Sequence, residues 1–149
     1  MYKIYLIILS AFFMGLSQHH IGLGWLAWFS LVPLIKFLTQ SKSLKDKIYL
    51  SIIWGGVYHC TILYWMIFNL GTTKILGLIS LLLAVLILSI NTILIAMSYH
   101  FISVNNFNRT FYFIPIIWVG IEYLRTFSIL GFPWVSIANS QAYYNILAQ

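Results

Sequence analysis

The sequence predicts an all-α membrane protein, a single helical bundle of about five transmembrane helices. Hydrophobic residues make up 62% of the 149 residues and charged residues only 7%, whereas about a quarter of a soluble domain is charged. The apolar residues also form continuous runs between short polar breaks, and membrane β-strands would instead alternate apolar and polar residues. The chain therefore lacks the polar surface that a water-soluble fold requires.

The first two predicted helices cover residues 2–17 and 22–38. Both runs are short beside the roughly 20 residues of a full span, so we expect their ends to extend into the polar breaks that follow. The first run also has features of a cleaved signal peptide, because Lys3 gives it a basic start and Gly15-Leu16-Ser17 resembles a cleavage site. Cleavage therefore stays open as an alternative to a retained helix.

The other three predicted helices cover residues 48–70, 75–102 and 111–130, and each has the length of a full span. Residues 131–149 follow as a loop on the outer face or as the start of a further helix. No long linker or internal repeat divides the chain, which argues against a transporter built from two repeated halves. The sequence predicts one transmembrane domain over residues 1–149.

Basic residues predict the orientation, because cytoplasmic loops of membrane proteins carry an excess of Lys and Arg. With the N-terminus in the cytoplasm, six of the eight basic residues fall on that side: Lys3, Lys36, Lys42, Lys45, Lys47 and Arg109. Lys74 and Arg125 fall towards the other side. The net charge of +6 thus comes from scattered residues without a basic stripe, and we expect no nucleic-acid partner.

Glu122 is one of only two acidic residues, and it lies inside an apolar run with Arg125 three positions later. Residues three apart share a helix face, so we expect these two side chains to meet. An ionisable residue inside a membrane is a candidate functional group. The pair could neutralise itself and fix helix packing, or Arg125 could extend to the interface and bind a lipid phosphate.

Gly131, Phe132, Pro133 and Trp134 predict the exit of the last helix from the membrane. Pro133 supplies no backbone donor and restricts Phe132 to extended conformations. Phe132 and Trp134 are typical of the headgroup level, where aromatic side chains anchor helix ends. A helix exit of this kind is compatible with a lipid-contact role.

Histidine and cysteine residues predict no metal site, cofactor or nucleophile. His19 and His20 are adjacent, with no carboxylate nearby, and neighbouring residues rarely point at one metal. Cys60 could lie at the depth of Glu122, but a reactive thiol needs a base or a cationic setting, and no lysine completes one within either span. We expect His59 to be a buried core residue and Cys60 a small buried hydrophobe.

Polar residues within the fourth run predict contacts between helices. Asn91, Ser89 and Thr92 lie near its middle, where such side chains typically bond to a neighbouring helix.

The stretch WVGIEYLRTFSILGFPWVSIANSQ, residues 118–141, resembles the fifth transmembrane segment and following loop of bacterial apolipoprotein N-acyltransferases. That region of the family has the pattern W-x-x-x-E-x-x-R followed by G-F-P-W, matched here by Trp118, Glu122, Arg125 and residues 131–134. GLGWLAWFSLVPLIKFL and WGGVYHCTILYWMIFNLG resemble the second and third spans more loosely. Because the resemblance includes the first segment, we favour a retained first helix.

The resemblance implies a membrane domain of eight helices with a large periplasmic nitrilase-like domain, in the inner membrane of a bacterium. Members of this family transfer an acyl chain from a phospholipid donor to the free amine of a diacylglyceryl-cysteine on an apolipoprotein acceptor. A Glu-Lys-Cys triad in the nitrilase-like domain forms the thioester intermediate. Glu122 does not match the catalytic glutamate, so no triad residue is carried over.

We therefore expect the membrane part of such an enzyme, either a truncated chain or one half of a split enzyme, because the sequence ends at Gln149 before the nitrilase-like domain. The missing domain would be encoded downstream or lie in a separate chain. The alternative is a non-catalytic membrane scaffold that binds lipid or a partner helix bundle.

Overall fold

The computed structural model describes residues 2–19, 21–103, 107–127 and 135–144. Within these ranges every regular element is helical, which confirms the predicted all-α class. The five α-helices are α1 Tyr2–His19, α2 Ala27–Gln40, α3 Leu44–Leu63, α4 Lys74–Ser103 and α5 Phe107–Thr126. Three short 3-10 helices accompany them: η1 Ile21–Leu26, η2 Tyr64–Phe68 and η3 Ile137–Gln141.

Three helical stretches of the described chain are long and apolar enough to cross a membrane: Gly22–Gln40, Leu44–Phe68 and Lys74–Ile102. In two of them a 3-10 helix continues an α-helix, since η1 precedes α2 and η2 follows α3. The helix α1 has 18 residues and is about 27 Å long at 1.5 Å per residue. It thus nearly matches a hydrocarbon core of about 30 Å. The helix α5 contains Arg109, Glu122 and Arg125, which lower its apolar character.

Two helix starts differ from the predicted ones. The third helix begins at Leu44, because Ser43 is still extended with φ −82° and ψ 130°. The predicted start at residue 48 assigned the charged residues Lys45, Asp46 and Lys47 to the preceding loop. The second α-helix begins at Ala27 because Ile21–Leu26 forms the tighter 3-10 turn.

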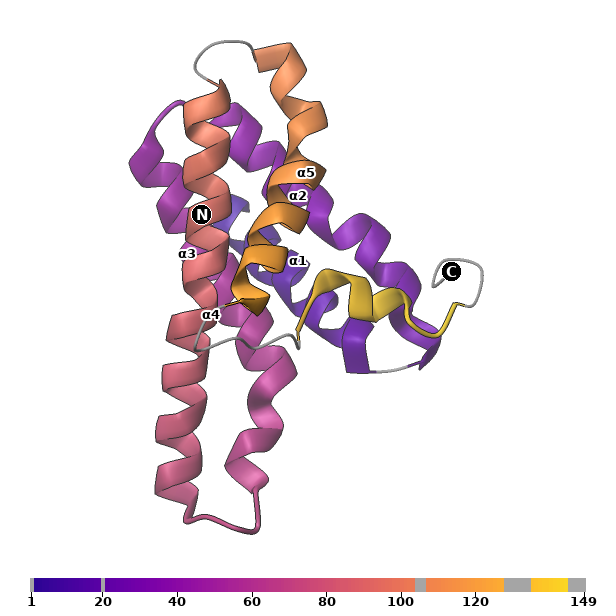
Figure 1. Cartoon of the computed structure of the whole chain (residues 1–149), viewed down its shortest axis with the longest axis vertical. Coiled ribbons are helices and arrows are strands. Elements are labelled where there is room, and N and C mark those ends of the chain that lie inside the picture. Colours follow the sequence, from indigo (N-terminus) through magenta and orange to yellow (C-terminus); the bar gives the residue numbers. More distant parts are fainter. Residues whose placement is uncertain (1, 20, 104–106, 128–134, 145–149) are drawn as a thin grey trace.

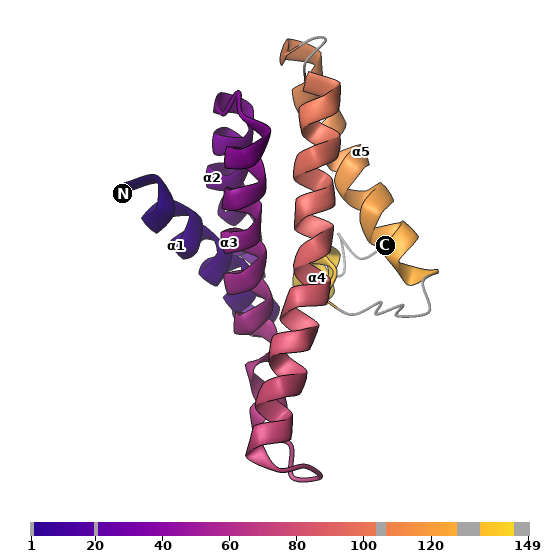
Figure 2. The ribbon, with the colours of Figure 1, turned by 90° about the vertical axis from the view of Figure 1, so that its left-hand side faces the viewer.

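The helices form two groups that meet along α3 and α4. Figure 2 shows α1, α2 and α3 on one side, α4 and α5 on the other, and α3 crossing α4. The most extensive helix packing is between α3 and α4, followed by the packing of α1 on α3. The turn between η2 and α4 extends beyond the other helices at the lower end of Figure 1. Because α3 packs on both α1 and α4, it contacts helices of both groups.

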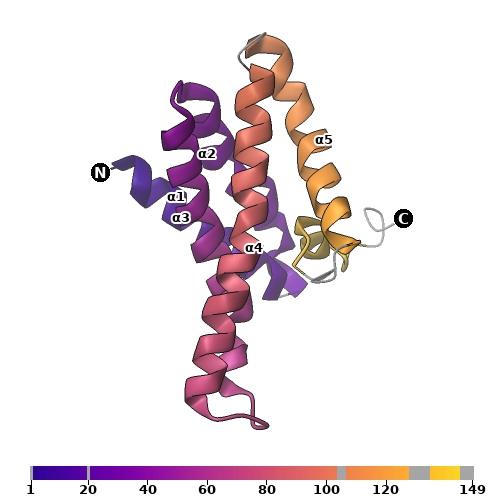
Figure 3. The ribbon, with the colours of Figure 1, turned by 60° about the vertical axis from the view of Figure 1, so that its left-hand side comes forward.

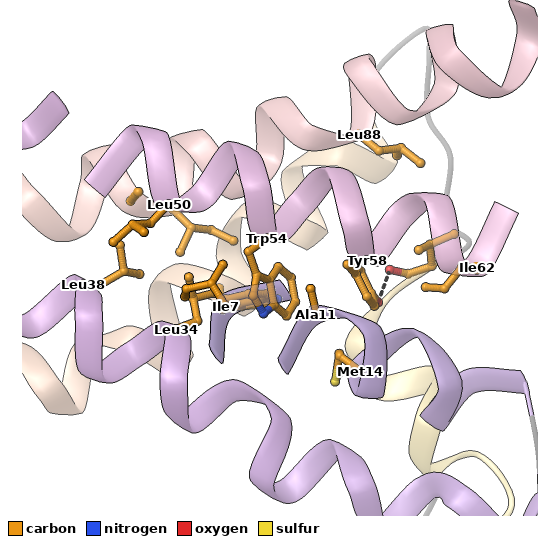
Figure 4. Packing of buried hydrophobic residues seen from close by; sticks show 14 of the residues in the cluster. Ile7, Ala11, Met14, Leu34, Leu38, Leu50, Trp54, Tyr58, Ile62 and Leu88 are labelled. Carbon is orange, nitrogen blue, oxygen red and sulfur yellow. Dashed lines mark hydrogen bonds between the residues drawn. The ribbon is translucent and has the colours of Figure 1, made fainter. Parts of the chain in front are cut away.

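Trp54 lies at the centre of the core and is fully buried. Its ring stacks on Tyr58 with 4.9 Å between centroids and meets Trp118 of α5 edge-on at 5.7 Å. Figure 4 shows Ile7 and Ala11 of α1 beside it. The indole Nε1 donates to Ser10 Oγ at 3.0 Å. One tryptophan of α3 thus contacts both α1 and α5.

Small and polar residues form the contact between α3 and α4. Thr92 Oγ1 lies 3.0 Å from the backbone oxygen of Ser51 in α3 and 2.8 Å from that of Ser89 in its own helix, so its one proton is shared between an interhelical and an intrahelical acceptor. Asn91 instead donates to the carbonyl oxygen of Leu88 in its own helix, at 3.2 Å. Gly55 lies against Thr92 and Ser89. A Cβ added at this position would therefore overlap Thr92 Oγ1 and come within 3.3 Å of Ser89 Oγ. The missing side chain lets the two helices approach closely.

The orientation leads to a labelling prediction, because the turns at Ser43 and Thr72 lie at opposite ends of α3 and η2 (Figure 1). In a Cys60→Ser background, Ser43→Cys is expected to resist a membrane-impermeant thiol reagent in intact cells. Thr72→Cys is expected to react, because the bias of basic residues predicts that the end of α3 at Ser43 is cytoplasmic and the end at Thr72 is on the other side. Both positions are exposed in the folded chain. The opposite labelling pattern would reverse the orientation.

Candidate functional site: the junction at Glu122

The chain after α5 returns across one end of the bundle. We call Val135–Tyr144, which contains η3, the return segment. It packs on η1 and on the C-terminal part of α1, and Figure 3 shows it beside the lower end of α5. The segment therefore brings residues far apart in the sequence to one place.

The Glu122 carboxylate joins α5 to the return segment. Its Oε1 accepts from Trp118 Nε1 at 3.0 Å and from the backbone nitrogen of Ile137 at 3.2 Å. Its Oε2 accepts from Ser136 Oγ at 2.7 Å. Trp118 lies one turn earlier on the same helix, whereas the other two donors belong to the return segment. Hydrogen bonds to an ionised carboxylate are roughly twice as strong as neutral ones, so three of them fix this side chain firmly.

Gln18 of α1 and Tyr58 of α3 hold the same stretch from the other side. Gln18 Nε2 donates to Tyr58 Oη at 2.6 Å and to the backbone oxygen of Ser136 at 3.0 Å. Tyr58 Oη donates to the backbone oxygen of Val135 at 3.2 Å. The backbone oxygens of Val135 and Ser136 are thus bonded to α3 and α1, while the Ser136 hydroxyl and the nitrogen of Ile137 are bonded to Glu122 of α5.

Val135 has a φ of 67°, in the left-handed region that β-branched residues rarely adopt. Such a conformation costs of the order of 1–3 kcal/mol and persists only where the surroundings enforce it. Here the side chain is 5% exposed and its carbonyl accepts the bond from Tyr58. The contacts of the return segment must therefore exceed this local cost.

The far end of the return segment is attached to η1. Gln141 Nε2 donates to the backbone oxygen of Gly24 at 2.9 Å and to Ser140 Oγ at 3.0 Å. A Cβ on Gly24 would overlap the backbone oxygen of Ser140 and lie 2.6 Å from the ring of Tyr144. Only glycine fits this close approach between η1 and the return segment.

The sequence could identify Glu122 and Trp118 as candidate site residues. It could not identify Gln18, Tyr58 and Ser136 as their neighbours in the junction. Glu122 is a lone acid in an apolar run, and Trp118 precedes it in the matched motif. Gln18 lies 118 positions from Ser136, its backbone acceptor. Helix periodicity does not reveal a contact over that distance. The one sequence signal near this contact is the polar Ser140-Gln141 pair that ends the motif.

The other predicted site residues are placed only in part. Arg125 lies one turn beyond Glu122 on α5 and is half-buried. The described donors to the Glu122 carboxylate come from elsewhere, and its pairing with Arg125 stays a prediction. Phe132, Pro133 and Trp134 lie outside the residues that the structure describes.

Among the described residues, His19, His59 and Cys60 donate no hydrogen bond to the Glu122 carboxylate. His59 is 2% exposed and its ring packs on Tyr58 at 4.9 Å, as expected for a core residue. His19 Nε2 donates to the backbone oxygen of Thr61 at 2.7 Å. Cys60 is exposed on α3, not buried as predicted. In the part of the chain that the structure describes, no three His, Cys, Asp or Glu side chains gather into a metal-binding group.

Comparison with known proteins relates this arrangement to a family. The family described as "Apolipoprotein N-acyltransferase N-terminal domain" matches residues 10–149, which include the return segment. The apolipoprotein N-acyltransferase of Geobacter metallireducens is 27% identical over 137 residues. The match covers 90% of this chain and 26% of that relative. No solved structure matches the chain significantly. The chain belongs to the family of apolipoprotein N-acyltransferase N-terminal domains.

Proposed function

We propose that the chain is the membrane part of an apolipoprotein N-acyltransferase in the inner membrane of a bacterium, with its N-terminus in the cytoplasm. The complete enzyme would transfer an acyl chain from a phospholipid to the N-terminal amine of a diacylglyceryl-cysteine lipoprotein. Family membership supports the activity. A nitrilase-like domain, downstream or in a separate chain, would supply the catalytic triad.

The observation that carries the structural part of this proposal is the attachment of the return segment through Glu122. Two of its three donors, Ser136 Oγ and the nitrogen of Ile137, belong to the return segment, so the Glu122 carboxylate ties that segment to α5. An acyl transfer at the membrane surface needs its catalytic groups held at a defined height and orientation, because small displacements strongly reduce the rate. Glu122 would act here as a positioning residue without touching the substrate.

We expect α4 and α5 to contact lipid, since Leu86 of α4 and Ile116 of α5 are both 66% exposed. Arg125 is the candidate for the phosphate of the phospholipid donor, since guanidinium groups pair well with phosphate. Phe132, Pro133 and Trp134 are the candidate aromatic anchors at the headgroup level.

The activity is tested on material from native membranes. A tag at the N-terminus of the chain retrieves it in mild detergent, and the eluate is incubated with a diacylglyceryl-cysteinyl peptide and phospholipid. The expected result is a gain of one acyl chain at the peptide amine by mass spectrometry, with a nitrilase-like sequence among the recovered polypeptides. Untagged membranes serve as the control. A tagged eluate that neither acylates the peptide nor contains such a sequence would favour the alternative, a non-catalytic membrane scaffold.

The chain alone is expected to form no acyl-enzyme with a tagged phospholipid. Cys60 is exposed on α3, and the hydrogen bonds described for the Glu122 carboxylate involve Trp118, Ser136 and Ile137 and not Cys60. A thiol without a base stays protonated and unreactive at neutral pH. The measurement is the covalent tag on the purified chain, with Cys60→Ser as the control. A hydroxylamine-sensitive mark that disappears in Cys60→Ser would show that Cys60 is a nucleophile.

A further inference from the structure

A cavity of 690 Å³ opens between the first turn of α1, the end of α2 and the first turn of α3. We call it the Lys3 cavity. It lies at the end of α1 away from Gln18 and therefore away from the Glu122 junction. The volume falls in the range of small-molecule sites, about 300–1,000 Å³.

The Lys3 cavity has one apolar and one polar wall. Phe37 and Leu50 are buried and form the apolar part together with Ile4. Lys3 of α1 and Lys42 of the turn after α2 line the polar part. The ammonium group of Lys3 lies 5.9 Å from the centroid of the Phe37 ring, where the two walls meet. A ligand that fits both walls is amphipathic and negatively charged at one end.

The other polar groups of the cavity add hydrogen-bonding capacity and one opposing charge. Gln40, Ser41 and Ser43 can donate to phosphate oxygens, and Asp46 is the one acidic side chain among the lining residues. Tyr2 and Tyr49 also line the cavity, and each carries a hydroxyl group that can donate a hydrogen bond. Two lysines against one carboxylate leave a charge of +1 around the cavity.

We propose that the Lys3 cavity binds the phosphodiester headgroup of an anionic glycerophospholipid from the leaflet at this end of the bundle. Lys3 and Lys42 pair with the phosphate, and the glycerol and first methylenes lie on Phe37 and Ile4. Basic pockets between transmembrane helices are typical sites for acidic headgroups. The cavity is formed by helix ends, which we expect to lie at headgroup depth. This site is distinct from the donor-lipid position of the proposed function and does not depend on that function.

The experiment is native mass spectrometry of the 149-residue chain in detergent. The chain is mixed with phosphatidylglycerol or with phosphatidylcholine of the same acyl chains, and the lipid that stays bound after removal of the detergent is measured. We expect preferential retention of phosphatidylglycerol. Lys3→Gln and Lys42→Gln are each expected to weaken its binding about fivefold, and Asp46→Asn to strengthen it. Lys45→Gln is the matched control, because Lys45 is exposed in the same region and does not line the cavity. Tryptophan fluorescence verifies that each variant is folded.

Three results would overturn the proposal. Equal retention of phosphatidylcholine would show that the cavity does not select an anionic headgroup. An equal loss in Lys45→Gln would show that the lysines act through general surface charge. Binding of inorganic phosphate that remains when the lipid is absent, with no competition by phosphatidylglycerol, would show a site for free phosphate instead of a lipid.

Discussion

Replacing Glu122 by Leu is expected to release the return segment from the end of the bundle and to lower the free energy of unfolding by about 3 kcal/mol. The substitution leaves Trp118 Nε1, Ser136 Oγ and the nitrogen of Ile137 without their acceptor. Each buried donor that loses its partner costs roughly 1–3 kcal/mol, and this site is half-buried, so the lower value applies. Unfolding in mixed micelles with increasing dodecyl sulfate, followed by tryptophan fluorescence, measures the change.

Release of the segment has its own readout. Ser140 is 2% exposed, so Ser140→Cys in a Cys60→Ser background is expected to react slowly with a thiol reagent. Adding Glu122→Leu is expected to make it react quickly while the helical content stays the same. Slow reaction in both backgrounds would show that the return segment stays in place without the carboxylate.

The variant Glu122→Gln separates the hydrogen bonds from the pairing with Arg125. An amide oxygen still accepts from Trp118 and Ile137, and the amide nitrogen can donate to the Ser136 hydroxyl, so we expect a loss of only about 1 kcal/mol. If the main role of Glu122 were to neutralise Arg125, Glu122→Gln would be strongly destabilising. Adding Arg125→Gln would then restore much of the lost stability. We expect no such restoration.

Replacing Gly55 by Ala is expected to push α3 away from α4 and to lower the free energy of unfolding by about 2–3 kcal/mol. The new Cβ would overlap Thr92 Oγ1 and lie 3.2 Å from Thr92 Cγ2. Thr92 is buried and bonded to Ser51, so it cannot move away without breaking that bond. The same micelle titration measures the loss of stability.

The adjacent glycine provides a matched control. A Cβ on Gly56 meets no atom within 4 Å, so Gly56→Ala introduces no clash. Alanine favours a helix over glycine by up to about 1 kcal/mol, and Gly56→Ala is therefore expected to be neutral or stabilising. Equal destabilisation by the two variants would mean that flexibility of α3, and not its approach to α4, explains the effect of Gly55→Ala.

Hydropathy alone predicted the helical class, because continuous apolar runs have only one stable form in a membrane. The 3-10 helix η1, Ile21–Leu26, was not predicted, since the second predicted helix began at residue 22 and Ile21 was left in the preceding break. The contacts of the return segment explain it, because η1 presents the backbone of Gly24 to Ser140 and Gln141. A local pattern does not report a tertiary contact of this kind.

In the candidate site, Glu122 shows the same limit of prediction from a local sequence pattern. Glu122 stood out because a charge in an apolar run needs compensation, and the nearest compensating group along the helix is Arg125. The structure gives the carboxylate two donors from a segment 14 and 15 positions later, beyond the end of α5. Residue chemistry thus identified the group that needs partners, while the fold decided where the partners come from.

A double-mutant cycle between Glu122 and Ser136 tests the central claim, that this carboxylate holds the return segment to α5. The variants are Glu122→Leu, Ser136→Ala and their combination, each measured by unfolding in mixed micelles. Ser136 also accepts from the nitrogen of Ala138, and the cycle cancels that separate effect. We predict a coupling free energy of about 1 kcal/mol or more. Strictly additive effects, with a coupling free energy near zero, would contradict the account.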